Sequence, residues 1–153
     1  MTAVSHTRGF SDAAEFVDRK SDEGRWRLRE LHAFGIGSTL RDELATVWDE
    51  CREPNWDGYD AMPVTQDTLR NAYQFLEAMP ADVPAPSIGA EPDGDLTLEW
   101  HQSPRRTLSV SVTPGCDLHY SALFGSRRSY GTETFFGDIP EIVLGLIRRV
   151  DAA

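Results

Sequence analysis

The chain has 153 residues, 40% of them hydrophobic, which is enough to form one domain around a single core. Its net charge is −10, and residues 39–99 hold three arginines against fourteen acidic residues, so the excess negative charge lies in the middle of the chain. Such a charge repels nucleic-acid phosphates and anionic membranes and attracts basic proteins, although acidic surfaces also simply keep small proteins in solution. We therefore expect no nucleic acid and no membrane as a partner.

Long apolar runs and cysteine motifs are both missing from the sequence. No run is long enough to span a bilayer, and residues 1–8 show no hydrophobic signal region, so we expect a cytoplasmic protein. Cys51 and Cys116 form no CxxC motif, and therefore neither a disulfide framework nor a zinc site is predicted. Lys20 is the only lysine among fifteen basic residues, which indicates a GC-rich coding sequence and favours a bacterial origin.

The chain divides into two parts by its patterns. Residues 1–38 are predicted to be a loosely structured N-terminal segment with short helices, at about 11–19 and 22–34. Residues 39–153 are predicted to form a single α+β domain.

Two helices open this domain. In the first helix, Thr39 is placed to cap the N-terminus, with Asp42 reaching back, and Pro54 ends the helix. The second helix begins after Thr65 and ends at Pro80. Both carry an apolar stripe at helical spacing. The stripes consist of Leu40, Leu44, Val47, Trp48 and Cys51 in the first helix, and of Leu69, Ala72, Tyr73, Leu76 and Met79 in the second.

After a proline-rich connector at 80–92, the apolar period changes from about 3.6 to 2, which indicates strands. Within the connector, Ser87–Ala90 is predicted to be a short edge strand. The alternating strands that follow are Leu96–Trp100, Leu108–Val112, Leu118–Phe124 and Tyr130–Thr134. Their short connections favour antiparallel hairpins in simple up-down order.

A closing helix follows the strands. Asp138 is predicted to cap it, with Glu141 at the capping-box position and Pro140 in the first turn, and a continuous apolar stripe runs from Ile139 to Val150. The order helix, helix, strands, helix predicts an α+β two-layer sandwich. In it, an antiparallel sheet of about four to five strands carries all the helices on one face.

The segment between the first two helices is the most informative for function. It holds Trp56, Asp57, Tyr59 and Asp60 around an Asp-Gly turn, between Pro54 and Pro63. Two interpretations are open: the aromatics fold back as a lid on the core, or they meet a partner or ligand with the acids as a polar rim. The same acids, with Asp49 or Glu53, could also hold a divalent cation, but their spacing does not match the calcium loop, and we predict no metal and no cofactor.

The other candidate lies on the solvent-facing side of the predicted sheet. Glu99, Ser109, His119 and Ser121 all fall on that side by alternation. His119 could act as a base oriented by Glu99 and serve one of the serines, because a nucleophile needs a nearby base and the base needs an orienting group. Polar side chains are also the ordinary composition of a solvated sheet face, and no catalytic motif supports the enzyme interpretation.

Asn55–Tyr59, Pro80–Pro92, Leu98–Trp100 and Leu118–Gly131 together carry a resemblance. The chain resembles a small family of uncharacterised bacterial proteins with an Asn-Trp-Asp-Gly-Tyr block, a proline-rich connector, a Leu-Glu-Trp strand and a glycine-rich aromatic hairpin. The resemblance covers about residues 40–150 and implies no activity, cofactor or catalytic residue.

These observations favour a non-catalytic acidic protein-binding module over an enzyme. Such a module would be an antitoxin-like or immunity-like protein, or an accessory partner of a neighbouring gene product, with a basic protein as its partner. The alternative is a small-molecule-binding domain or minor hydrolase that uses the polar sheet face around His119. A structural or oligomerising protein is a third possibility, and a homo-oligomer is compatible with each of the three.

Overall fold

The computed structural model describes residues 36–152. The predicted segment 1–38 lies outside this range, except for its last three residues, which belong to the first described helix. The elements, in chain order, are α4 (Ile36–Cys51), α5 (Gln66–Ala78), β1 (Ser87–Ala90), β2 (Leu96–Ser103), β3 (Arg106–Val112), β4 (Asp117–Phe124), β5 (Arg127–Thr134) and α6 (Glu141–Asp151).

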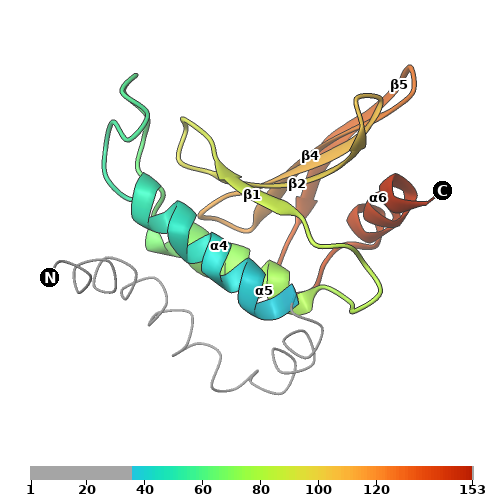
Figure 1. The fold of residues 1–153 in the computed structure, drawn as a ribbon, viewed down its shortest axis with the longest axis horizontal. Helices are drawn as coiled ribbons and strands as arrows, with labels where there is room; N and C mark the ends of the chain where they lie inside the picture. The colour runs from blue at the N-terminus through green and yellow to red at the C-terminus, as the bar shows by residue number, and fades with distance from the viewer. Residues whose placement is uncertain (1–35, 153) are drawn as a thin grey trace, which may run out of the picture.

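The strands form one antiparallel sheet in the order β1-β2-β3-β4-β5, so each strand pairs with its neighbours in sequence. Figure 1 shows α4 and α5 side by side beneath the sheet and α6 at the other end of the same face. The predicted α+β sandwich with a five-stranded antiparallel sheet and helices on one face is confirmed.

The core lies between the helices and the sheet. Alternation places Leu98, Val110 and Tyr120 in one cross-strand row of the covered face, and all three are buried. From α5, the ring of Phe75 packs on Trp100 and Phe135 at centroid distances of 6.3 and 5.8 Å. The period-2 pattern therefore identified the buried face of the sheet correctly.

Helix beginnings differ from the sequence prediction at two of three places. Thr65 does cap α5, and its hydroxyl accepts the N–H of Thr68. The predicted Thr39 cap is wrong, because α4 already includes Ile36. The Asp138 cap is wrong as well, because α6 begins at Glu141 after Pro140 and no side chain caps it. The backbone carbonyl of Pro140 accepts the N–H groups of Val143 and Leu144.

None of the helices within residues 36–152 is long and apolar enough to cross a membrane.

Candidate interaction surface

The segment of residues 52–63, which we call the Trp56 loop, joins α4 to α5. Its backbone turns sharply, because Asn55 (φ 61°), Gly58 (φ 79°) and Asp60 (φ 65°) all adopt the left-handed region. Gly58 does so without strain, and Asn and Asp are the residues with side chains that tolerate this region best. The choice of residues thus fits the path that the loop takes.

Hydrogen bonds within the loop hold this shape. The Asp57 carboxylate accepts the N–H groups of Tyr59 and Ala61 at 2.7 and 3.1 Å. The Asn55 side chain accepts the N–H of Asp60 at 2.8 Å, and the backbone N–H of Asn55 donates to Ala61 at 2.8 Å. Asp57 therefore builds the loop rather than standing free for a partner.

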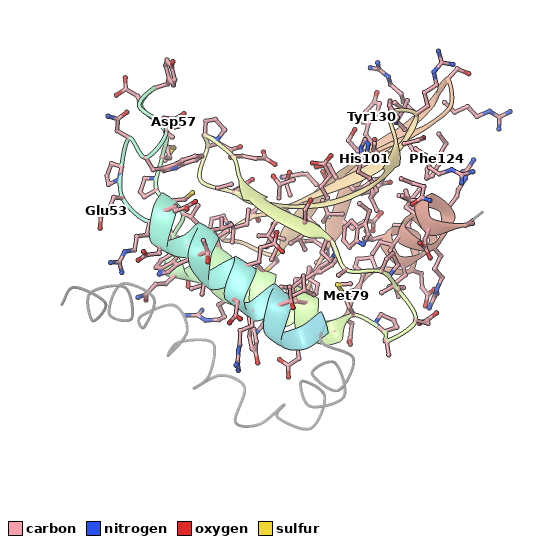
Figure 2. The ribbon with its side chains drawn as sticks, viewed as in Figure 1. Glu53, Asp57, Met79, His101, Phe124 and Tyr130 are labelled. Carbon is pink, nitrogen blue, oxygen red and sulfur yellow. The ribbon has the colours of Figure 1, made fainter. Side chains whose placement is uncertain are left out.

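The two aromatic residues have different environments. Trp56 is half-buried against the core, and its indole N–H donates to the carbonyl of Met62 at 2.8 Å. Tyr59 is 88% exposed, and Met62 is 60% exposed. The lid interpretation thus describes Trp56, whereas Tyr59 and the exposed Asp60 lie on the surface. Figure 2 shows the loop, marked by Glu53 and Asp57, at one end of the molecule.

A second acidic segment lies against this loop. It is the β1–β2 turn, residues 91–95, which we call the acidic turn. The N–H of Met62 donates to Pro92 at 2.8 Å. Gly94 adopts φ +93°, and a Cβ there would lie 2.9 Å from the carbonyl oxygen of Pro63. This close approach explains why glycine occupies the position.

Three carboxylates of the acidic turn come together, those of Glu91, Asp93 and Asp95, within 4.8 Å of one another. Partial burial, then the charges of Asp93 and Glu91, raise the pKa of Asp95 from 3.8 to about 6, while His119 lowers it. Glu91 also accepts the hydroxyls of Thr97 and Ser111 at 2.5 Å each. The sequence Asp93-Gly94-Asp95 by itself most simply predicts a hairpin turn, although acids at every second position from Glu91 were a visible signal of the cluster.

These three carboxylates are the only cluster of potential metal ligands within the described part of the chain. Among the described residues, no such group of three ligand residues forms around Asp57 and Asp60, where the sequence suggested a possible cation site. Carboxylate oxygens are ligands that hard divalent cations accept. Exposed acids also cluster without any ion, and the arrangement does not establish a metal site.

Comparisons with protein-family models, with curated proteins and with solved structures find no match. The resemblance stated from the sequence stays a prediction.

The polar side chains predicted on the open face of the sheet separate into two cross-strand rows. Glu99, Ser109 and Ser121 are directly opposite one another on β2, β3 and β4. His119 lies in the next row, where its Nδ1 contacts the Thr132 hydroxyl at 2.8 Å. The residue hydrogen-bonded to His119 is therefore Thr132, and Glu99 does not take the orienting position that a catalytic triad requires.

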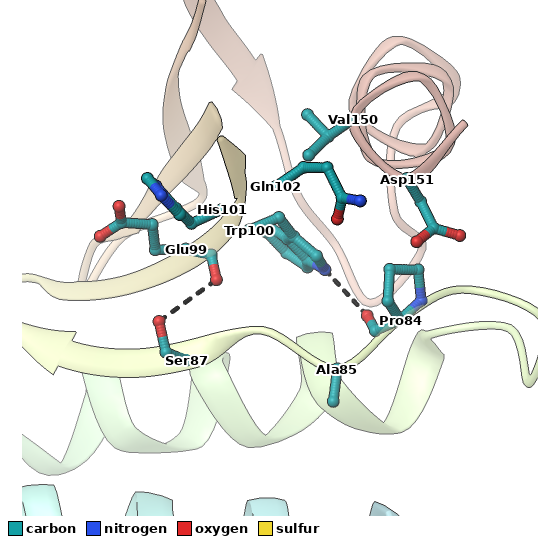
Figure 3. A pocket seen from close by; sticks show the side chains of 9 residues that line it. All are labelled: Pro84, Ala85, Ser87, Glu99, Trp100, His101, Gln102, Val150 and Asp151. Atoms are coloured by element: carbon teal, nitrogen blue, oxygen red, sulfur yellow. Dashed lines mark hydrogen bonds between the residues drawn. The ribbon is translucent and has the colours of Figure 1, made fainter. Parts of the chain in front are cut away.

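A cleft of about 270 Å³ opens between β1, β2 and the end of α6 (Figure 3). Of the predicted open-face residues it includes Glu99, but not Ser109, His119 or Ser121. Trp100 lines it and donates its indole N–H to Pro84 at 2.8 Å. The remaining lining residues are Ala85, Ser87, His101, Gln102, Val150 and Asp151.

Proposed function

We propose that this protein is a non-catalytic protein-binding module whose contact surface is the Trp56 loop together with the acidic turn. The observation that carries the proposal is Tyr59, which is 88% exposed on a loop held in one shape by its own hydrogen bonds. Tyrosine is a favoured anchor at protein interfaces, because it buries a large apolar area and offers a hydroxyl.

The rigidity of the loop supports this role. Binding orders flexible residues at a free-energy cost, and a loop that is already ordered avoids much of it. Asn55 and Asp60 also hold left-handed backbone conformations, which cost about 1 kcal/mol each for residues with a side chain. Such a cost is typical of loops that are shaped for function.

The surroundings of Tyr59 favour a basic partner. Glu53 and Asp60 are exposed on the same loop, and the carboxylates of the acidic turn lie beside it. Partial burial and then the negative charges of Asp93 and Glu91 raise the pKa of Asp95, and a partner's Arg or Lys side chains would relieve the repulsion between these charges. We infer that such a partner is the product of a neighbouring gene in a bacterial cytoplasm, and that this chain is its antitoxin-like, immunity-like or accessory protein.

The alternative, a small-molecule-binding domain or hydrolase, has weaker support. The cleft beside Glu99 is smaller than most ligand pockets, which measure about 300 to 1,000 Å³. His119 pairs with a threonine, and Glu99 stands in a different row of the sheet. A metabolite screen by thermal shift, with His101→Ala as the cleft variant, would favour the alternative if a ligand stabilised the wild type and not the variant.

The test of the interaction role is affinity capture from the encoding organism at low and moderate salt, with mass spectrometry of the captured proteins. We expect a stoichiometric basic partner with wild-type protein, weakened as salt rises because screening reduces charge attraction. Tyr59→Ala and Asp60→Arg should each lose most of it. Hydrogen exchange on the complex should show slower exchange at residues 52–63.

Tyr130→Ala is the matched control, because it removes a second tyrosine that is 81% exposed on β5, in the other half of the molecule. It should capture the partner as wild type does. Capture that survives Tyr59→Ala combined with Asp60→Arg would refute the proposed surface, and the absence of any partner would refute the proposed function.

A further inference from the structure

The two edge strands of the sheet are protected to different degrees. On β1, the Glu43 side chain of α4 accepts the outward N–H of Ile88 at 2.9 Å, and α4 packs along this strand. On β5, no strand of the described chain pairs with the outer edge, and no described helix packs against it closely. β5 is also twice as long as β1, eight residues against four.

The outward-facing groups of β5 follow from its pairing with β4. Beyond the strand end, the N–H of Phe135 donates to Cys116 of the β4 side at 2.6 Å. Since hydrogen bonding alternates along an antiparallel strand, the odd-numbered residues bond to β4 and the even-numbered ones point outward. Arg128, Tyr130 and Thr132 therefore present unpaired backbone N–H and C=O groups at the outer edge.

Natural edge strands are commonly blunted by charged side chains, lysine above all, by proline, by a bulge or by a covering element. β5 contains neither lysine nor proline, and its pairing with β4 runs without a register shift. Tyr130 in its middle is 81% exposed. The charges lie at the ends instead, with Arg127 and Arg128 at the start and Glu133 near the end.

This charge order is self-complementary. When a strand pairs antiparallel with a copy of itself, its basic start meets the acidic end of the copy. A basic or acidic foreign peptide would match only one end of β5, so the pattern favours a second copy of this chain.

We propose that β5 pairs antiparallel with β5 of a second copy, which joins the two sheets into one across a two-fold axis. Outward groups must meet outward groups, so Tyr130 lies opposite the Tyr130 of the partner subunit, and Arg128 lies opposite the partner's Thr132. In this register Arg127 lies directly opposite the partner's Glu133, in a pair whose side chains approach closely. Opposite charges so placed stabilise a sheet.

The two neighbouring allowed registers lose this match. In the register centred on Gly131, Arg127 would lie opposite the apolar Phe135, which is buried in the core. In the register centred on Ser129, Arg127 would lie opposite the partner's Gly131. Charge complementarity therefore selects the register centred on Tyr130.

The first measurement is the mass in solution of the full chain across a concentration series, by light scattering or sedimentation. We expect a species of twice the 17.1 kDa chain mass that dissociates on dilution. Hydrogen exchange at the N–H groups of Tyr130 and Thr132 should slow as the dimer forms. A wild type that remains monomeric at every concentration would overturn the proposal.

The decisive test is a charge swap. Arg127→Glu and Glu133→Arg each place like charges opposite one another, and each should weaken dimerisation at least tenfold. The double variant restores opposite charges and should dimerise again. Single variants that dimerise like the wild type, or a double variant that stays monomeric, would contradict the pairing. Tyr59→Ala should leave the mass unchanged, which separates this test from that of the Trp56 loop.

Discussion

Two exposed tyrosines mark two surfaces of different physical character. Tyr59 is 88% exposed on the Trp56 loop, and Tyr130 is 81% exposed on the edge strand β5. Figure 2 shows Tyr130 in the half of the molecule opposite to the loop residue Asp57 along the long axis. An occupant of one surface therefore leaves the other free.

The difference between them lies in the backbone. In the Trp56 loop, the N–H groups of Tyr59, Asp60 and Ala61 are already bound within the loop. These three backbone donors are therefore not available to a partner, and we expect it to contact chiefly side chains and their charges. On β5 the backbone itself is available, so strand pairing supplies the contact and the side chains at the ends fix the register. Substitutions that alter one surface or one edge at a time therefore separate these two kinds of contact.

The largest effect is expected at Gly131, which lies opposite Tyr120 in the pairing of β5 with β4. A Cβ there would lie 2.7 Å from the Tyr120 hydroxyl oxygen and 2.9 Å from its ring carbon Cζ. Because Tyr120 is buried, its ring cannot swing away freely, and Gly131→Ala should lower the free energy of unfolding by about 1 to 3 kcal/mol. Urea denaturation measures this change.

Gly89→Ala is the control on the opposite edge strand. A Cβ at Gly89 meets nothing within 4 Å, so the same substitution should be neutral or raise the free energy of unfolding by about 0.5 kcal/mol. Equal destabilisation by both variants would mean that the space beside Tyr120 is not what matters.

In the Trp56 loop, Asp57→Ala removes the acceptor of two backbone N–H groups. We expect a loss of about 1 to 2 kcal/mol in the free energy of unfolding, measured in urea, and weaker partner capture. Asp57→Asn keeps an acceptor oxygen and should retain most of the stability. If the alanine variant matched the wild type in both stability and capture, the loop would not depend on Asp57 for its shape.

At the protected edge, Glu43→Ala removes the acceptor of the Ile88 N–H. The expected loss is about 1 kcal/mol, with faster hydrogen exchange at Ile88, because water replaces the carboxylate. Glu43→Gln offers an amide oxygen at the same place and should exchange more slowly than the alanine variant. An unchanged rate at Ile88 in Glu43→Ala would show that α4 protects β1 without this hydrogen bond.

The elements were predictable from the sequence where periodicity is strong. The alternation through Leu98, Val110 and Tyr120 predicted both the strands and their buried face. Helix caps were predictable only in part, because several chain groups compete for the same N–H donors. At α6 the carbonyl of Pro140 accepts them, and the nearby Asp138 side chain does not.

The site could be located from the sequence but not resolved in detail. Trp56 and Tyr59 are both aromatic residues next to an aspartate in the same loop, so the sequence does not distinguish the half-buried Trp56 from the exposed Tyr59. The difference depends on the path of the backbone, which includes left-handed conformations at Asn55 and Asp60. Sequence spacing also does not indicate the contact between Met62 and Pro92, because this contact joins segments far apart in the chain. Alternation places Glu99 and His119 on the same face of the sheet. Only the pairing register of the strands shows that the two residues lie in different cross-strand rows.

The smallest effect concerns the acidic turn, and it depends on pH. Partial burial, and then the charges of Asp93 and Glu91, raise the pKa of Asp95 from 3.8 to about 6, so the folded chain holds this proton more tightly than the unfolded chain. The stabilising contribution is complete below pH 3.8 and is lost as the pH rises toward about 6. Asp95→Asn removes the carboxylate that destabilises the folded chain at neutral pH, so it should raise the free energy of unfolding there. The expected gain is only about 1 kcal/mol, because solvent screens a partly exposed carboxyl.

Urea denaturation of both proteins at acid and neutral pH checks this expectation. The difference between variant and wild type should be near zero below pH 3.8, grow as the pH rises from 3.8 to about 6, and level off above about 6. Asp117→Asn removes the same formal charge from an exposed position on β4. If both variants gained equally, the gain would come from the lower net charge of the whole chain. A gain confined to Asp95→Asn would locate the repulsion in the acidic turn, where a basic partner would relieve it.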